Sequence, residues 1–81
     1  MITGAQLRAA RALLKWSAKE VAEKSGVALT TVQRLEQTDG PASGRAQTHF
    51  ELQRAFEAAG VEFIGSPDDK PWVRLAGKAA K

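Results

Sequence analysis

Residues 17–36 read SAKEVAEKSGVALTTVQRLE, and this stretch decides the fold of the chain. Ser17 stands three residues before Glu20, a spacing at which the two side chains cap each other's backbone N–H groups at the start of a helix. Gly26 ends that helix, because glycine adopts the left-handed conformation of a tight turn at little cost. A second short helix begins near Ala28 or Leu29. The stretch therefore predicts two short helices joined by a turn.

The second of these helices has two distinct faces. Val32 and Leu35 fall on one side at helical spacing, and Val27 fills the turn before them. The outward side carries mostly hydrogen-bonding residues, which can reach the edges of bases: Leu29, Thr30, Thr31, Gln33 and Arg34. This layout is typical of a helix-turn-helix and makes DNA the first partner to consider.

A further helix is predicted on each side of this stretch. Residues 3–6 repeat the capping-box spacing with Thr and Gln, so the first helix is expected from about Gly4 to Lys15. Residues 37–47 carry the turn signals of a loop. Thr48 and Glu51 then predict the capped start of a fourth helix.

Beyond Gly60, where the fourth helix is expected to end, the pattern changes from helical to alternating. Residues 61–64 and 72–75 are runs of β-branched and aromatic residues, separated by a long loop over residues 65–71. They predict a β-hairpin that packs on the helices or pairs with another chain, because an isolated ribbon is marginal in water. The expected fold class is mainly α, divided into a four-helix domain over residues 1–60, a hairpin over 61–75 and a flexible tail over 76–81.

Composition excludes several classes of function. The chain has 81 residues and no cysteine, which leaves neither disulfides nor thiolate metal sites, and His49 alone builds no zinc site. No apolar run approaches the roughly 20 residues that span a bilayer, and no signal segment follows Met1, so a cytoplasmic location is expected without a membrane. No catalytic set of nucleophile, base and acid is visible. We therefore expect no enzyme activity, no cofactor and no metal.

The charge of the chain favours a polyanionic partner. The formal net charge is +3, and seven of the twelve basic residues lie in the first 45 positions against four acids. Contacts to phosphates supply most of the affinity for DNA and make it salt dependent. The candidates for such contacts are Arg8, Ser17, Lys19, Ser43, Gly44 and Arg45. For Arg8 and Lys19 a merely solvated surface is the alternative.

Residues 7–36 resemble the helix-turn-helix domain of the phage repressor, Cro and XRE family. The positions that match its pattern are Leu7, Ala10, Arg11, Leu14, Ser17, Val21, Ala22, Gly26, Val27, Val32, Arg34, Leu35 and Glu36. The whole chain is similar to small single-domain XRE-like regulators of bacteria. The resemblance implies that the second helix of the pair enters the major groove. It places Leu29, Thr30 and Arg34 towards the bases, with Thr31 and Gln33 at the edge of the set.

The resemblance also assigns a structural pair and shows two departures. In this family the positions of Arg11 and Glu36 commonly form an ion pair that ties the first helix to the end of the recognition helix. Ala18 stands where many members carry a glutamine that bridges phosphate and the neighbouring helix. Ala28 replaces a frequent serine cap. Both changes are expected to weaken contacts without disturbing the fold.

These observations predict a sequence-specific transcriptional regulator that binds double-stranded DNA. We expect a homodimer on a palindromic operator, because one small module reads only a half-site. The candidate dimer contacts are Phe50, Phe56, Phe63, Ile64, Trp72 and Val73, and packing of the same residues within the chain is the alternative. Two other functions stay open: a protein-interaction module, such as an antiactivator or antitoxin, and a recombination accessory factor that bends DNA.

Overall fold

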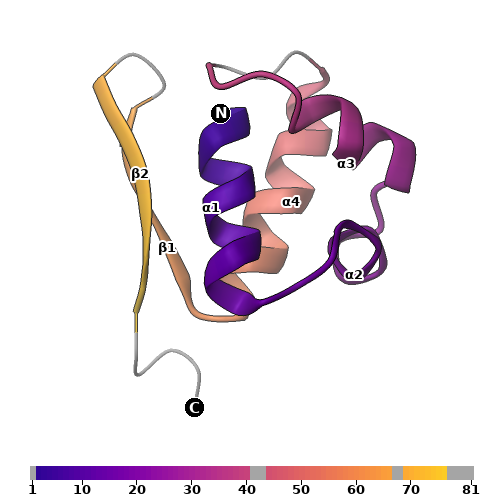
Figure 1. Ribbon diagram of the computed structural model, residues 1–81, viewed down its shortest axis with the longest axis horizontal. Helices are drawn as coiled ribbons and strands as arrows, with labels where there is room; N and C mark the ends of the chain where they lie inside the picture. The colour runs from indigo at the N-terminus through magenta and orange to yellow at the C-terminus, as the bar shows by residue number, and fades with distance from the viewer. Residues whose placement is uncertain (1, 41–43, 67–68, 77–81) are drawn as a thin grey trace.

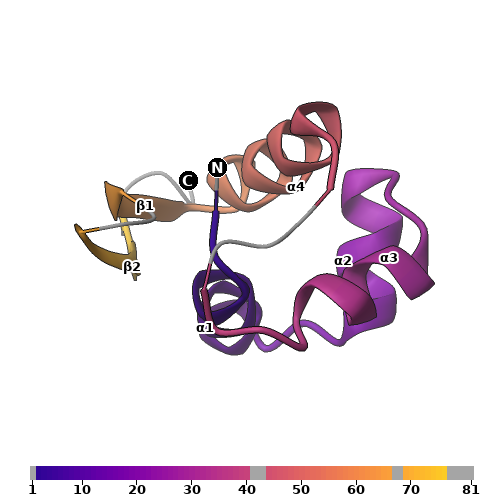
Figure 2. The same ribbon diagram turned by 90° about the horizontal axis from the view of Figure 1, so that it is seen from above.

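Four helices and a C-terminal hairpin make up the described part of a computed structural model, residues 2–40, 44–66 and 69–76. In chain order they are α1 (Gly4–Leu14), α2 (Ala18–Ser25), α3 (Leu29–Leu35), α4 (Ala46–Ala58), β1 (Val61–Ser66) and β2 (Asp69–Leu75). The predicted fold class is confirmed. Helices α1 and α4 lie between the hairpin on one side and α2 with α3 on the other (Figure 1, Figure 2). Of the expected tail, residues 77–81 lie outside the described ranges.

The first two helices begin where the sequence provides capping side chains. Thr3 Oγ1 accepts the backbone N–H of Gln6 at 3.0 Å, and Gln6 Oε1 accepts that of Thr3 at 2.9 Å. Ser17 and Glu20 form the same reciprocal pair at the start of α2, at 3.1 and 2.8 Å. Gly26 ends α2 in the left-handed conformation, with a φ of 79°. Both capping boxes and the turn at Gly26 are therefore confirmed.

The hydrophobic core joins all the helices to the hairpin. Its buried members are Ile2, Leu7, Ala10, Val21, Val32, Leu35, Leu52, Phe56, Val61 and Val73. Trp16, between α1 and α2, stacks on Phe56 with ring centroids 5.6 Å apart. Phe63 of β1 approaches the same ring at 6.1 Å. Aromatic packing at these distances holds the hairpin against the helical layer.

The hairpin packs with β2 against α1 and β1 against α4. Gln6 of α1 fixes its position, because its Nε2 donates to the backbone oxygens of Ile64 and Trp72 at 3.3 and 3.0 Å. The same Gln6 side chain therefore caps α1 and holds both strands. The hairpin pairs within the chain, which is one of the two arrangements that the sequence left open.

The prediction of a long hairpin loop over residues 65–71 is wrong. The two strands pair antiparallel with Val61 opposite Leu75, and pairing continues to Ser66 opposite Asp69. A register shift between Ile64 and Ser66 allows this extension, since the intervening glycine has a φ of 76°. The residues that signalled a loop therefore belong largely to the strands.

Helix α4 begins earlier than the sequence pattern indicates. Thr48 does not cap it; the N-cap is Arg45, without a side-chain cap, and Thr48 lies in the first turn. The next residue, His49, is 3% exposed. Burial of His49 accompanies this earlier start, in which tertiary packing overrides the local capping signal.

Gly4 allows the first turn of α1 to lie directly against the end of α3. A Cβ atom at this position would stand 1.7 Å from the backbone oxygen of Thr38 and 2.7 Å from that of Leu35. The backbone N–H of Gly4 donates to the oxygen of Gly40 at 3.0 Å, and that of Ala5 donates to the oxygen of Asp39 at 3.4 Å. Only a residue without a side chain fits this approach.

We expect Gly4→Ala to lower the free energy of unfolding by about 1–3 kcal/mol, because the methyl group collides with fixed backbone atoms. In an ordinary helix interior the same substitution raises stability by roughly 0.5–1 kcal/mol. Urea unfolding followed by circular dichroism measures the difference. Gly40→Ala is the matched control, since no atom lies within 4 Å of a Cβ added there. A Gly4→Ala variant as stable as the wild type would contradict the close approach.

Candidate nucleic-acid interface

Helix α3 is held by one face and exposed on the other. Val32 and Leu35 are buried in the core, at 0% and 1% exposure. The structure brings the predicted base-reading residues together on α3, where Leu29, Thr30, Gln33 and Arg34 are exposed and Thr31 is half-buried. The helix begins without a side-chain cap, because its N-cap residue is Ala28. The outward surface of α3 is therefore a row of hydrogen-bonding side chains with one apolar member at its start.

The residues predicted to contact phosphates are spread over the starts of two helices, α2 and α4, and over α1. Ser17 and Lys19 are exposed at the start of α2. Gly44 and Arg45 are exposed immediately before α4. Ser43 lies outside the described residues. Whether any of these residues contacts DNA stays a prediction.

Arg8 differs from the other phosphate candidates because the chain itself uses its guanidinium. Nη1 donates to the backbone oxygen of Glu36 at 2.5 Å and to that of Thr38 at 3.2 Å. Nη2 forms an ion pair with the carboxylate of Asp39. The alternative of a merely solvated side chain is wrong, since the Arg8 side chain spans from α1 to the segment after α3. A contact of Arg8 with phosphate stays untested. Because its guanidinium is used within the chain, we leave Arg8 out of the proposed phosphate contacts.

Arg11 and Glu36 form the ion pair that the resemblance implies. Arg11 Nε donates to Glu36 Oε2 at 2.8 Å, and Nη2 donates to Oε1 at 3.2 Å, a bidentate geometry. The Glu36 side chain is 11% exposed and that of Arg11 is 31% exposed. Arg11 Nη1 also donates to the backbone oxygen of Trp16 at 3.3 Å. The pair joins the last turn of α1 to the residue that follows α3.

Residues 7–44 match the helix-turn-helix family model, which covers α1 from Leu7 onward, α2, α3 and the segment after them. These residues carry an XRE-like helix-turn-helix. The match supports, in general terms, a DNA-binding regulator of transcription. No curated protein and no solved structure matches the chain significantly. In the described ranges no helix is both long enough and apolar enough to cross a membrane.

Two of the six candidate dimer contacts are buried within the chain and are therefore wrong as surface contacts. Phe56 is 0% exposed and Val73 is 3% exposed, so both side chains belong to the core of one chain. Phe63 and Ile64 are half-buried. Phe50 and Trp72 are 57% and 54% exposed. Packing of the hairpin on the helices accounts for the buried members.

Three residues with clear roles were not selected from the sequence. Gly4 permits the approach of α1 to the end of α3, and Asp39 receives the Arg8 guanidinium. Leu13 is 39% exposed and lines a groove with Trp72 and Val73 of the hairpin. A glycine inside a helical pattern is a usable signal of close backbone contact. The partner of Asp39 has no comparable signal, because it is distant in sequence.

We expect the Arg11–Glu36 pair to couple two distant parts of the domain. In a double-mutant cycle of Arg11→Met and Glu36→Gln, each single change should cost about 1–3 kcal/mol of unfolding free energy, because each leaves a partly buried charge poorly solvated. The measured coupling should exceed about 1 kcal/mol. The Glu62–Arg74 pair, whose side chains are 48% and 65% exposed, is the matched control and should give less than about 1 kcal/mol. Equal coupling in the two cycles would contradict a structural role for the Arg11 pair.

Proposed function

We propose that this domain reads DNA by placing the exposed side of α3 in the major groove. The observation that carries the proposal is the division of α3 between Val32 and Leu35 in the core and a polar row that faces away from the domain. The major groove is wide enough to admit a helix, and it presents a distinct pattern of donors and acceptors for each base pair.

The chemistry of the outward residues ranks them for base reading. Arg34 offers a planar pair of donors that matches O6 and N7 of guanine. Thr30 both donates and accepts, and its methyl group can contact thymine. Leu29, which is 37% exposed, offers an apolar contact only. We place Thr31 and Gln33 at the edge of this set, because Thr31 is half-buried and the family resemblance places Gln33 there.

Phosphate contacts complete the proposed interface. Lys19 and Arg45 supply cations, and Ser17 and Gly44 supply a hydroxyl group and backbone N–H groups at the starts of α2 and α4. These contacts carry no sequence information but fix the register of the domain on the duplex. The salt slope is the slope of log K plotted against log[salt]. Each phosphate that a cation neutralises makes this slope more negative by roughly 0.9.

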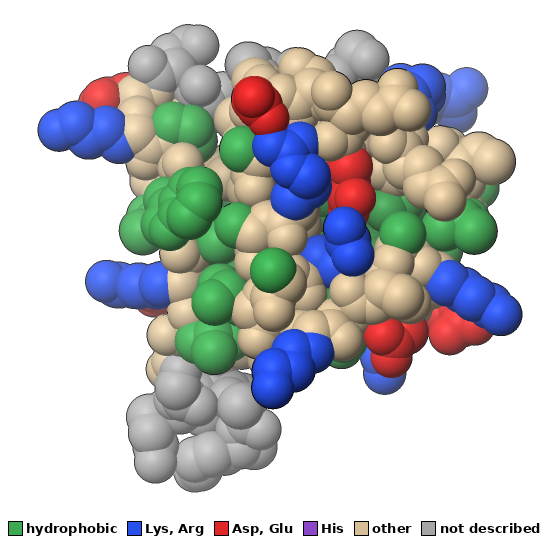
Figure 3. Space-filling view, viewed as in Figure 1, with side chains coloured by type: hydrophobic (Ala, Val, Ile, Leu, Met, Phe, Trp, Pro, Cys, Tyr) green, Lys and Arg blue, Asp and Glu red, His purple; other side chains and the backbone are tan. Residues whose placement is uncertain are grey.

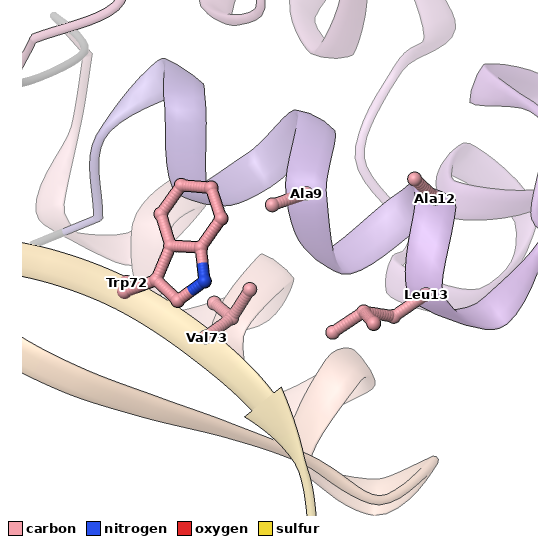
Figure 4. Close-up of a pocket in the computed structure, with 5 residues that line it drawn as sticks. All are labelled: Ala9, Ala12, Leu13, Trp72 and Val73. Atoms are coloured by element: carbon pink, nitrogen blue, oxygen red, sulfur yellow. The ribbon is translucent and has the colours of Figure 1, made fainter.

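A second copy of the chain is proposed to dock on an apolar surface that α1 and β2 share. We call it the α1–β2 patch; its members are Ala9, Ala12, Leu13, Trp72 and Val73. Figure 3 shows apolar side chains gathered over β2 and the neighbouring face of α1. A groove of about 290 Å³ runs through the patch, with the Trp72 ring on one wall and the side chains of α1 on the other (Figure 4).

The shape of the patch favours self-association. The large Trp72 side chain is 54% exposed and stands beside a hollow that Ala9 and Ala12 leave in α1. A two-fold axis brings each protruding ring to the hollow of the other copy, since an isologous interface uses the same surface twice. The patch lies on the hairpin side of α1, and α3 lies on the other side of the molecule (Figure 1). Contacts made through the patch alone leave both α3 helices uncovered, as two half-sites of one operator require.

Selection from a random duplex library tests DNA reading directly. With the selected duplex, Arg34→Ala should relax the preference at one base pair by about 1–3 kcal/mol. Lys19→Ala should weaken binding to all sequences alike and flatten the salt slope by about one unit. Lys70→Asn removes a hairpin lysine distant from α3 and is the control for charge alone; asparagine tolerates its φ of 54°. A chain that enriches no sequence, or equal losses for Arg34→Ala on every duplex, would overturn the proposal.

Sedimentation equilibrium of the full chain tests the proposed dimer. Trp72→Lys should weaken self-association by about tenfold or more, because it places a charge in the centre of the apolar patch. Phe50→Lys is the matched control: this aromatic residue is equally exposed but lies on α4 outside the patch. Dimers that dissociate with Phe50→Lys and not with Trp72→Lys would place the interface elsewhere. A wild-type chain that stays monomeric on the selected duplex would exclude a dimer.

A further inference from the structure

The guanidinium of Arg8 forms a clamp at the end of α3, one turn before Arg11 on α1. The clamp consists of Arg8, the backbone oxygens of Glu36 and Thr38, and the carboxylate of Asp39. Three acceptors on one segment thus meet a single side chain from another helix. The sequence separation between donor and acceptors is 28 to 31 residues. The clamp is therefore a tertiary contact and not part of the local folding of α3.

Helix α3 depends on such a contact because it has little stability of its own. It contains seven residues and lacks a side-chain N-cap, and helices of this length do not persist in isolation. The last carbonyl groups of a helix have no partner within it. Arg8 supplies donors to the carbonyl of Glu36, the C-cap residue, and brings a positive charge to the negative end of the helix.

The backbone of α1 fixes the same segment at a second place. The N–H groups of Gly4 and Ala5 donate to the oxygens of Gly40 and Asp39. Arg8 reaches that segment one turn further along α1. With the segment held at both places, the end of α3 cannot slide along α1 or rotate away from it. The direction of the outward row on α3 is set by this arrangement.

We propose that Arg8 is a positioning residue for base reading, which acts through α3 and not by touching DNA. The proposal rests on the proposed function, since it assumes that α3 enters the major groove. It assigns Asp39 to the same device. A small displacement of the end of α3 moves the side chains of its first turn relative to the base edges, so loss of the clamp should reduce sequence-specific binding more than non-specific binding.

The effect of Asp39→Ala distinguishes a positioning role of Arg8 from a direct contact of Arg8 with phosphate. A carboxylate near DNA repels phosphates, so simple electrostatics predicts that Asp39→Ala raises the affinity for every duplex. The clamp predicts the opposite for the selected duplex, because Arg8 loses its charged partner. If Arg8 contacts phosphate, its removal should also flatten the salt slope, whereas removal of a clamp residue should leave that slope unchanged.

The test measures binding of the full chain to the selected duplex and to a mixed-sequence duplex of equal length, across a salt series. Arg8→Ala should weaken binding to the selected duplex by about tenfold. Asp39→Ala should weaken it by about two- to fivefold, because the Asp39 side chain is 88% exposed and Arg8 keeps its two backbone acceptors. The double variant should lose little more than Arg8→Ala, as for residues in one contact. The salt slope should stay within about 0.3 of the wild-type slope, well below the 0.9 of one phosphate contact. Lys19→Ala is the control for a lost phosphate contact, because it should flatten the salt slope by about one unit.

A readout without DNA keeps the two proposals distinguishable. Native-state amide hydrogen exchange of Arg8→Ala should accelerate in α3 and residues 36–40, and exchange in α4 and the hairpin should stay unchanged. If the wild-type chain selects no duplex, the proposed function fails and exchange alone decides whether the clamp holds α3. Three results would each overturn the role of Arg8. They are unchanged exchange in α3 of Arg8→Ala, a salt slope that Arg8→Ala flattens by about one unit, and tighter binding by Asp39→Ala.

Discussion

The close approach of α1 to the end of α3 is the contact on which the rest of the molecule depends. The missing side chain of Gly4 lets two backbone hydrogen bonds join the first turn of α1 to residues 39 and 40. On the other side of the same turn, Gln6 holds both strands of the hairpin. Helix α1 is thus the shared support of the proposed reading helix and of the proposed dimer surface, and a change in its first turn reaches both.

The two ends of α3 are held very differently. Its C-terminal end meets two arginines of α1, one through the Glu36 carboxylate and one through the Glu36 carbonyl group. Its N-terminal end has no side-chain cap and carries the exposed Leu29 and Thr30. These intramolecular contacts of the ends of α3 therefore concentrate at its C-terminal end, next to Arg34. The N-terminal end, with Leu29 and Thr30, has no such contacts among the described residues, and contacts with DNA can add to its stability.

Local signals predicted the parts of this structure that depend on neighbours in sequence. The capping pair at Ser17 and Glu20 and the turn at Gly26 need only residues within one helical turn. The contacts of Arg8 within the chain were not predicted, because its acceptors are mostly backbone oxygens distant in sequence, and no side-chain pattern marks them. Phe56 was misassigned for another reason. From sequence alone, an aromatic residue of a core looks the same as one of an interface. The packing of α4 between the other helices and the hairpin places Phe56 in the core.

The use of Arg8 inside the domain limits what one copy can offer to a duplex. Of the cations first considered for phosphate contacts, Lys19 and Arg45 remain, so one copy has a salt slope of roughly −2 at about −0.9 for each contact. That is a small electrostatic contribution for a domain whose reading helix carries Arg34 as its single cation. Two copies on one operator double both the phosphate contacts and the base pairs read. Sequence-specific binding by this chain is therefore expected to require the second copy. Helix α1 holds α3 through its arginines, and it also contributes to the α1–β2 patch, on which that copy is proposed to dock.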